Sequence, residues 1–423
     1  MDPSDQSKWL YEPITLPTEW VESYRPGGLH PVQLGDTFKK GRYKIIRKLG
    51  HGSFSTVWLA QDIRKSALVA VKITRADAQK ASKKELRMCR KLENADRSPG
   101  DSSAEIRVVN LLDSFKHTGP NGVHRCFVFE PMGPSVQEML EVLPPSSSYV
   151  VVKSVLKQVL LGLHFLHSNE IAHGDLNPGN ILCSLRKFTE HDKGVLLEQP
   201  AESIISAPVR RKDGQGHGGS PKCLYIAQPL IQMVDHTANL NVKLSDLGSA
   251  FPFSKPPQKP TTPIALRAPE VILDCPISHK IDIWAFGCLI FEFLTGYPLF
   301  QVSNWSSIPQ HQKDDDHLLQ MYDTLGKFPE SLFEKWARGG RYFGANMEVI
   351  RTDVGSAEIA EGEIYTGPSL EAGLKRQRPR GMDDGEVEKV NVVLRKILRY
   401  EAELRPSTAE LLEDEWFASA ELE

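Results

Sequence analysis

The sequence of 423 residues has no apolar run that approaches the roughly 18 residues of a membrane-spanning helix, and its polar start, MDPSDQSK, is not a signal peptide. Its six cysteines stand apart, without a C-x-x-C pair, which argues against a structural zinc site and for free thiols in a reducing compartment. The formal net charge of −3 provides no general attraction to nucleic acid or to an anionic membrane. We therefore expect a monomer of the cytoplasm and/or nucleus that binds neither a membrane nor nucleic acid directly.

Charge is unevenly distributed along this otherwise ordinary composition, which is 40% hydrophobic and 25% charged. Residues 36–95 contain 16 Lys or Arg against five Asp or Glu, whereas the stretch KDDDH at 313–317 is acidic. Either stretch is compatible with plain solvated surface. The length fits one large bilobed domain or two to three smaller ones.

Hydrophobic periodicity predicts strands early in the chain and helices later. Strands are expected at 42–50, 54–62, 66–74, 108–115 and 123–130. One helix is expected at 77–93, and apolar helices follow at 151–167 and 281–296, the last apolar nearly all round and therefore buried. The pattern predicts an α+β, bilobal fold, in which a small antiparallel β-rich lobe with one helix precedes a larger, mainly helical lobe.

The expected boundaries follow from these changes of pattern. They place an N-terminal arm at 1–40, a small lobe at 41–131 and a large lobe at 132–420. Two segments interrupt the large lobe. Residues 184–239 have few periodic runs, so we expect an insert that is partly disordered, and residues 351–386 form a polar insert.

A glycine-rich stretch, GHGSFSTV at 50–57, lies between two expected strands. A dinucleotide-binding turn would lead from a strand into a helix, so this context favours a hairpin that covers ATP phosphates. The apolar strand 66–74 places Lys72 beyond this hairpin, and Glu85 follows in the expected helix. Together they predict an ion pair that directs the lysine at the α- and β-phosphates.

Phe129 is expected to border the adenine, with backbone contacts from the segment that follows it. The residues expected to bind ATP are Leu49, Gly50, His51, Gly52, Ser53, Phe54, Ser55, Val57, Ala70, Lys72, Phe129, Glu130 and Met132.

A loop typical of phosphotransferases, HGDLNPGN, occupies 173–180, and Asp246-Leu247-Gly248 follows a further expected strand. In this pattern Asp175 is the catalytic base, while Asn180 and Asp246 hold magnesium. Kinases of small molecules such as aminoglycosides and choline carry a similar HGD-x-x-x-x-N loop, so the loop alone leaves the class of kinase open.

Three distant residues distinguish the two classes. Glu270 ends the motif Ala-Pro-Glu, Asp282 begins the apolar helix, and Arg405 stands near the C-terminus. In protein kinases the glutamate pairs with such an arginine, and the aspartate anchors the backbone of the catalytic loop. Kinases of small molecules lack this trio, so the sequence predicts a protein kinase.

A narrower resemblance rests on GGLHPVQLGDTFKKGRYKIIRKLGHGSFSTVWLA (27–60), NGVHRCFVFEPMG (121–133) and DDDHLLQMYDTLGKFP (314–329). These stretches resemble the SR-protein kinases, and the chain looks like a diverged, fungal-like member of that family of serine/threonine protein kinases. The resemblance implies ATP and Mg²⁺ as cofactors. It also implies Arg/Ser-rich partners such as splicing factors, and hence a role in regulating mRNA splicing. Asp316 and Asp323 fall where the family has carboxylates of an acidic docking groove, whose third acid is replaced by Tyr297.

Two departures from the usual protein-kinase loop bear on activity. Gly174 replaces an arginine that binds a phosphorylated activation segment, but the SR-protein kinases also lack it. Asn177 replaces a lysine that steadies the γ-phosphate, and losing one such contact typically costs on the order of 10²–10³ in rate. Pro263 replaces a threonine of the same network. The sequence therefore favours an active kinase, and the alternative is an ATP-binding pseudokinase that acts as a scaffold.

Overall fold

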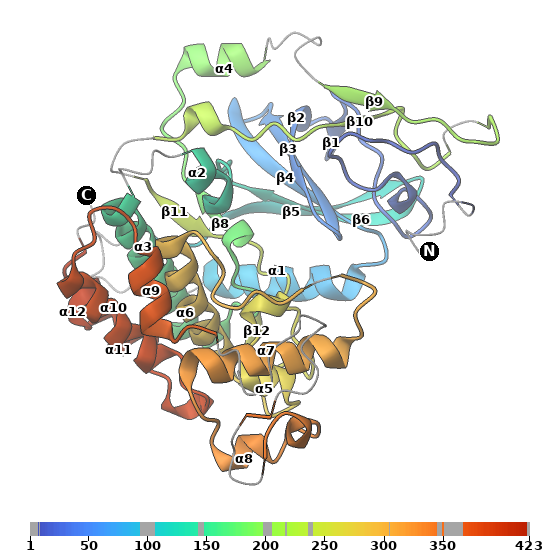
Figure 1. The fold of residues 1–423 in the computed structure, drawn as a ribbon. Helices are drawn as coiled ribbons and strands as arrows, with labels where there is room; N and C mark the ends of the chain where they lie inside the picture. The colour runs from blue at the N-terminus through green and yellow to red at the C-terminus, as the bar shows by residue number, and fades with distance from the viewer. Residues whose placement is uncertain are drawn as a thin grey trace. The chain divides into compact units, whose positions relative to one another are not determined.

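The computed structural model describes residues 7, 9–93, 106–142, 148–197, 205–215, 218–235, 240–303, 305–344, 349–350 and 367–420. The chain divides into two compact units, which are described separately here (Figure 1). The first unit combines 1–139 with 182–248, and the second combines 140–181 with 249–423. This division differs from the expected one, because the insert 184–239 belongs to the first unit instead of the helical lobe.

A six-stranded antiparallel sheet forms the centre of the first unit, in the order β1-β2-β3-β4-β6-β5. Its strands are β1 (Thr37–Phe38), β2 (Tyr43–His51), β3 (Ser55–Asp62), β4 (Ala67–Thr74), β5 (Leu111–Gly119) and β6 (Gly122–Phe129), with the helix α1 at Gln79–Glu93. The expected meander and helix are therefore present. The first strand after the helix starts at Leu111 instead of 108, because Val108 forms only an isolated parallel bridge with Leu244.

The alternation of the strands sets the core of this sheet. Apolar side chains from one face gather into a buried cluster that includes Phe38, Tyr43, Ile45, Trp58 and Val128. Burying such side chains is the main favourable contribution to folding, at about 25 cal/mol per Å² of apolar surface.

The N-terminal arm and the insert fold together onto the first unit. Tyr11, Val21 and Tyr24 of the arm form a buried cluster with Val209 and Leu224 of the insert. The insert contributes the antiparallel pair β9 (Ser206–Pro208) and β10 (Cys223–Tyr225), as well as α4 (Glu190–Leu197) and η6 (Ile231–Met233). Its described parts are folded, while 198–204, 216–217 and 236–239 lie outside the described residues, so the expectation of partial disorder stays a prediction.

A buried ion pair fastens the arm to the sheet. The ammonium of Lys48 on β2 contacts the carboxylate of Glu19, and it also donates to the backbone oxygen of Tyr225 at 2.9 Å. Only 2% of Lys48 is exposed, so its charge depends on these partners. Three further short elements lie wholly or partly in this unit: η2 (Val21–Ser23), β8 (Ile181–Cys183) and β11 (Val242–Leu244).

Helices dominate the second unit. Its longest elements are α3 (Ser148–Ser168), α6 (Lys280–Thr295), α7 (Gln310–Leu325) and α10 (Asp384–Ile397). The shorter ones are α5 (Pro269–Ile272), α8 (Glu330–Phe333), α9 (Leu370–Gln377), α11 (Thr408–Leu412), α12 (Glu415–Ala418), η4 (Pro178–Asn180), η7 (Ile264–Leu266), η8 (Gly339–Arg341) and η9 (Ala402–Leu404). The strands β7 (Ile171–Ala172) and β12 (Phe251–Pro252) pair antiparallel, and α2 (Val136–Val142) spans the boundary between the units.

The apolar character of α6 reflects its burial. Almost every residue of this helix is buried, as the sequence predicts for a helix that is apolar all round. The polar insert 351–386 is only partly described. Residues 351–366 lie outside the described residues, and 370–377 form α9, which buries Leu370 and Leu374.

One helix among the described residues is long and apolar enough to cross a membrane by length and composition alone. It is the segment Tyr149–Ser168, whose apolar window is 67% buried inside the protein. The core helix of a water-soluble protein passes the same test, so this feature is weak evidence for a membrane span.

Candidate active site

The glycine-rich hairpin joins β2 to β3 in the first unit. Gly50 lies opposite Val57, and the tip closes with a hydrogen bond from the Gly52 N–H to the Ser55 oxygen at 2.9 Å. Among the described residues, no atom beyond the adjacent residues lies within 4 Å of where a side chain of Gly50 or Gly52 would start, and Phe54 at the tip is exposed. The backbone here is therefore open to the close approach of a ligand such as a phosphate.

Lys72 lies between two carboxylates of the same unit. Its Nζ is 2.8 Å from Glu85 Oε1 on α1 and 2.8 Å from Asp246 Oδ1. Burial opposes the charge of Lys72, but the two carboxylates outweigh it and raise the pKa of the lysine, which stays protonated. The structure thus brings together three residues that the sequence predicts, separated by 13 and 174 positions.

Asp246 itself has an unusual backbone. Its φ is +58°, a left-handed conformation that is strained for a residue with a side chain. Its Oδ1 accepts a hydrogen bond from the Gly248 N–H at 3.1 Å, and a side chain at Gly248 would start only 3.0 Å from that oxygen. Its side chain is 46% exposed, so the carboxylate can still reach a metal ion.

The segment expected to contact adenine follows β6. Phe129 pairs with Ala70 across β4 and β6. The Glu130 N–H donates to the Asn110 oxygen at 3.3 Å, and its carboxylate is held by Lys243 at 3.0 Å. Glu130 therefore makes structural bonds through its N–H and its side chain, and the contact of adenine with the backbone of this segment stays a prediction.

The catalytic loop lies in the second unit and folds around Asp175. Asn180 Nδ2 donates to the Asp175 backbone oxygen at 2.9 Å. Asn177 Nδ2 donates to the same oxygen at 3.0 Å and to Asp175 Oδ1 at 3.3 Å, while its own Oδ1 accepts from the Gly179 N–H at 3.0 Å. Asn177 is thus both the cap of η4 and a neutral partner of the catalytic carboxylate.

Asp282 anchors this loop as expected. Its two oxygens accept from the N–H groups of His173 at 2.7 Å and Gly174 at 2.8 Å. His167 Nε2 lies 2.9 Å from one of the same oxygens, a contact that the sequence analysis missed. Although burial opposes its charge, these hydrogen bonds hold the pKa of Asp282 below its usual value, so it remains ionised.

The neighbour of Pro263 contacts the catalytic loop. The hydroxyl of Thr262 is 3.4 Å from the Gly174 oxygen, and Thr262 is buried. In the sequence only Pro263 stands out in this segment, because it replaces a threonine of other protein kinases. The contact from the preceding residue had no local signal, because it joins segments 88 residues apart.

The predicted pair of Glu270 and Arg405 is present and buried. Two parallel hydrogen bonds of 2.6 and 2.7 Å join the guanidinium to the carboxylate. Arg405 also donates to the backbone oxygens of Arg399, Tyr400 and Lys280, so its remaining donors have partners. A paired and fully hydrogen-bonded arginine can be buried without a large desolvation penalty.

The two proposed docking carboxylates lie on α7. Asp316 is exposed and accepts from Gln320 at 3.0 Å, while Asp323 is half-buried and accepts from the Gly367 N–H at 3.0 Å. Asp315, which the sequence analysis did not select, is buried and bonds Trp336 Nε1 at 2.8 Å. Asp315 is therefore structural, and the two selected residues are the more accessible ones.

The donor chemistry of both units fits Mg²⁺ and a nucleotide. Asp246 offers a carboxylate and Asn180 a side-chain amide, whose Nδ2 donates to the Asp175 backbone oxygen. Within the described part of the chain, no group of three or more His, Cys, Asp or Glu side chains could hold a metal ion. A magnesium ion that takes most of its ligands from phosphates and water needs no such cluster.

These folds and residues define a protein kinase. The family model for the protein kinase domain matches residues 43–193 and 231–417, and the chain belongs to that family. A solved crystal structure of the PF14_0431 kinase domain shares the fold, with a TM-score of 0.62 at 22% identity over 91% of this chain and 98% of that one.

Within this class the chain belongs to the SR-protein kinase family. It is 31% identical to the serine/threonine-protein kinase SRPK of Physarum polycephalum, over 95% of this chain and 91% of that protein. Protein kinase dsk1 of Schizosaccharomyces pombe is 28% identical over 77% of this chain and 73% of the relative. The chain is therefore a serine/threonine protein kinase.

Proposed function

We propose that this kinase transfers the γ-phosphate of ATP, with Mg²⁺, to serines of Arg/Ser-rich proteins. The observation that carries the proposal is the ion-paired Lys72, held between Glu85 and Asp246 at 2.8 Å from each. A largely buried lysine with a pKa perturbed by two specific carboxylates is a candidate functional group. Membership of the SR-protein kinase family supports the choice of substrate.

Each residue has a stated role in this proposal. Lys72 binds the α- and β-phosphates, Asp246 holds one magnesium ion and Asn180 holds a second. Asp175 accepts the proton of the serine hydroxyl. Asn177 positions Asp175 through its 3.3 Å bond to the carboxylate. Magnesium-ATP supplies the phosphoryl group and neutralises its charge, and the residues contribute position and electrostatics.

The proposed recognition of substrate uses the carboxylates on α7. Asp316 is exposed, whereas Asp323 is half-buried, with Oδ1 buried and Oδ2 bonded to the Gly367 N–H. Carboxylates bind arginine through charge-assisted, often bidentate hydrogen bonds, so replacing arginine by lysine in a peptide should weaken such recognition.

The test is transfer of labelled phosphate from ATP to an Arg/Ser octapeptide, with a Lys/Ser octapeptide and the Asp175→Ala enzyme as controls. We expect transfer to the Arg/Ser peptide only. Asp316→Asn should raise KM for this peptide several-fold and leave kcat unchanged, whereas the exposed Asp274→Asn should change neither.

Two outcomes would reject parts of the proposal. Transfer that does not exceed the Asp175→Ala background would reject catalysis and leave an ATP-binding scaffold. Equal use of the Lys/Ser peptide would reject Arg/Ser recognition but keep the kinase. The compartment, cytoplasm and/or nucleus, and the monomeric state remain proposals, to be tested with a fluorescent fusion and by light scattering.

A further inference from the structure

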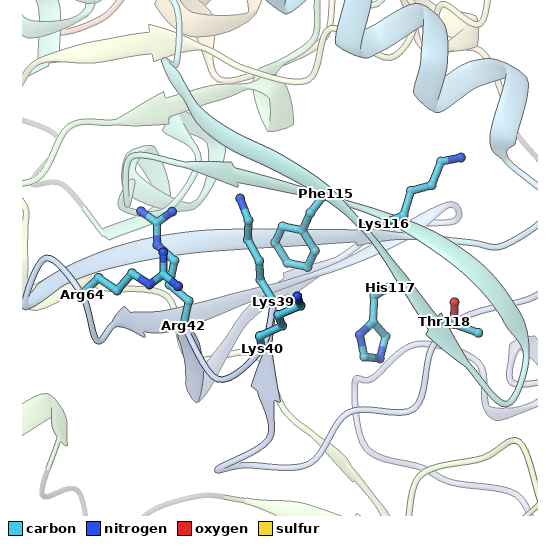
Figure 2. Close-up of a pocket in the computed structure, with 8 residues that line it drawn as sticks. All are labelled: Lys39, Lys40, Arg42, Arg64, Phe115, Lys116, His117 and Thr118. Carbon is cyan, nitrogen blue, oxygen red and sulfur yellow. The ribbon is translucent and has the colours of Figure 1, made fainter.

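A pocket of the first unit lies apart from every residue of the candidate active site (Figure 2). Its volume is about 440 Å³. Its lining comes from three segments: Lys39, Lys40 and Arg42 between β1 and β2, Arg64 between β3 and β4, and residues 115–118 of β5. Most of these residues are Lys or Arg and none is acidic, so the pocket is built for an anion.

The charges of the pocket are only partly neutralised. Lys39 Nζ is 2.5 Å from Asp113, and Arg42 contacts both Asp113 at 3.3 Å and Asp62 at 2.7 Å. The bond from Arg42 holds the pKa of Asp62 below its usual value, so this carboxylate is ionised. In Figure 2 Lys116 points away from the other cations. Asp113 and Asp62 offset two of the four remaining cations, and Asp36 lies near His117 of the lining, so the pocket keeps an excess of positive charge.

Two of these cations are available to a ligand. Within the described residues, the side chains of Lys40 and Arg64 form no ion pair, and both are exposed. Lys39 and Lys40 have φ values of +49° and +56°, a left-handed conformation that suits glycine or asparagine better than lysine. The turn thus keeps strained lysines at the pocket, as is common where strain serves a function.

The excess of cations at the pocket, with Lys40 and Arg64 outside any ion pair of the described residues, suits a phosphate monoester. Such a group carries about −1.5 to −2 charges at pH 7, and it binds arginine and lysine through charge-assisted hydrogen bonds. A carboxylate or a phosphodiester carries only one. His117 adds no charge, because burial lowers its pKa in spite of the nearby Asp36. Phe115, stacked on Tyr43 at 5.7 Å, provides an apolar wall for the stem of the ligand.

The position of the pocket favours a peptide as the carrier of the phosphate. Its wall, residues 115–118, belongs to β5, the end strand of the six-stranded sheet. An end strand presents backbone N–H and C=O groups to which an extended peptide can add. A lipid headgroup makes no use of such an edge.

We propose that this pocket binds a phosphoserine-bearing peptide, the chemical form of the product of this kinase. That this peptide is the product of the enzyme rests on the proposed function. Phosphorylation changes an Arg-Ser dipeptide from one positive charge to about one negative charge. The pocket would therefore repel the unmodified tail and retain the phosphorylated one, which keeps a partly modified substrate on the enzyme.

The proposal is tested by fluorescence anisotropy of a labelled Arg/phosphoserine octapeptide, with its unphosphorylated form as reference. ATP is left out, so the outcome does not depend on catalysis. We expect the wild type to bind the phosphopeptide at least tenfold more tightly than the reference. The double variant Lys40→Gly/Arg64→Ala should weaken phosphopeptide binding at least tenfold.

A matched control removes two exposed positive charges from α1 of the same unit, in the variant Lys83→Ala/Arg87→Ala. It should change binding less than twofold. Lys40→Gly relieves strain at a positive φ, so the thermal midpoint of that single variant should be unchanged or higher. A loss of binding by the double variant can then be separated from unfolding by measuring its midpoint.

Three results would overturn the proposal. They are equal binding of both peptides, equal loss in the pocket and control variants, and tighter binding to phosphoinositide vesicles or single-stranded RNA than to the phosphopeptide. If the kinase assay fails and phosphopeptide binding survives the controls, the proposed function is wrong and the pocket still binds phosphopeptides. If transfer occurs without such binding, the proposed function stands and the pocket proposal fails.

Discussion

Replacing Gly174 by alanine tests whether the catalytic loop can tolerate any side chain at this position. Its φ is +76°, and an added Cβ would lie 2.8 Å from the Ser249 oxygen and 3.2 Å from the Phe251 ring. The loop cannot easily move away, because the Gly174 N–H is bonded to Asp282 at 2.8 Å. The substitution therefore adds backbone strain to a steric clash with the Ser249 backbone oxygen and close contact with the Phe251 ring.

The two effects have separate magnitudes. The left-handed conformation costs an alanine about 1–2 kcal/mol. Overpacking against a neighbour that cannot yield costs about 1–3 kcal/mol more. Together they predict that Gly174→Ala lowers the free energy of unfolding by about 2–5 kcal/mol. For a unit of this size, that corresponds to a thermal midpoint lower by roughly 5–15 °C.

Gly296 is a matched control in the same unit. It ends α6 with a φ of +77°, but no atom lies within 4 Å of where its side chain would start. Gly296→Ala should therefore cost only the conformational part, about 1–2 kcal/mol. Thermal unfolding followed by circular dichroism compares the two variants.

If Gly174→Ala loses no more stability than Gly296→Ala, the contact with Ser249 does not constrain the loop and the reasoning is wrong. The same strain applies to Gly174→Arg, which restores the arginine common in other protein kinases. We expect that variant to be at least as destabilised as Gly174→Ala and to gain no response to phosphorylation, measured as kinase activity before and after phosphatase treatment.

Three further predictions concern the core and the catalytic loop. Arg405→Leu should cost about 3–5 kcal/mol in urea unfolding, because it leaves the buried Glu270 charged and unpaired, and the additional change Glu270→Leu should recover most of that loss. Burial lowers the pKa of His30 to about 3, so its imidazole stays neutral in the folded protein. The free energy of unfolding is therefore highest above pH 6.5 and falls as the pH drops below 6.5, because the histidine of the unfolded state then gains a proton. Between pH 7 and pH 5, the unfolding free energy of His30→Asn should therefore fall by about 2 kcal/mol less than that of the wild type. An equal fall in both proteins would contradict the lowered pKa of His30. Asn177→Lys removes the cap on the Gly179 N–H and should lower the free energy of unfolding by about 1 kcal/mol. It should not raise kcat. A higher kcat would show that the missing positive charge limits catalysis.

The catalytic pairings could be predicted from sequence because they depend on short, regular elements. Strand alternation places Lys72 in β4, and the helix that follows carries Glu85, so their pairing at 2.8 Å requires only that neighbouring elements pack. The pairing of Glu270 with Arg405 spans 135 residues and was predictable only through the motifs that mark each end.

Other features had no such signal. Asn177 looked like a lost lysine, and only the folded loop shows that it caps η4 and bonds Asp175. Thr262 contacts Gly174 across 88 residues, and no periodicity indicates that contact. The role of a side chain such as that of Thr262 depends on which distant segment packs against it in the folded protein.

The sequence alone determined the class of protein and most of its strands and helices, and it predicts the residues of the phosphate and metal sites. These depend on local periodicity and on motifs whose spacing is short compared with the chain. Only the tertiary structure decided that the arm and the insert cover one sheet, and that Lys48 is buried against Glu19. It also decided that four of the basic residues between 36 and 95, Lys39, Lys40, Arg42 and Arg64, border one pocket, while others such as Lys83 and Arg87 lie exposed on α1. Burial and charge pairing depend on which segments meet in space, and a local pattern of residues does not contain that information.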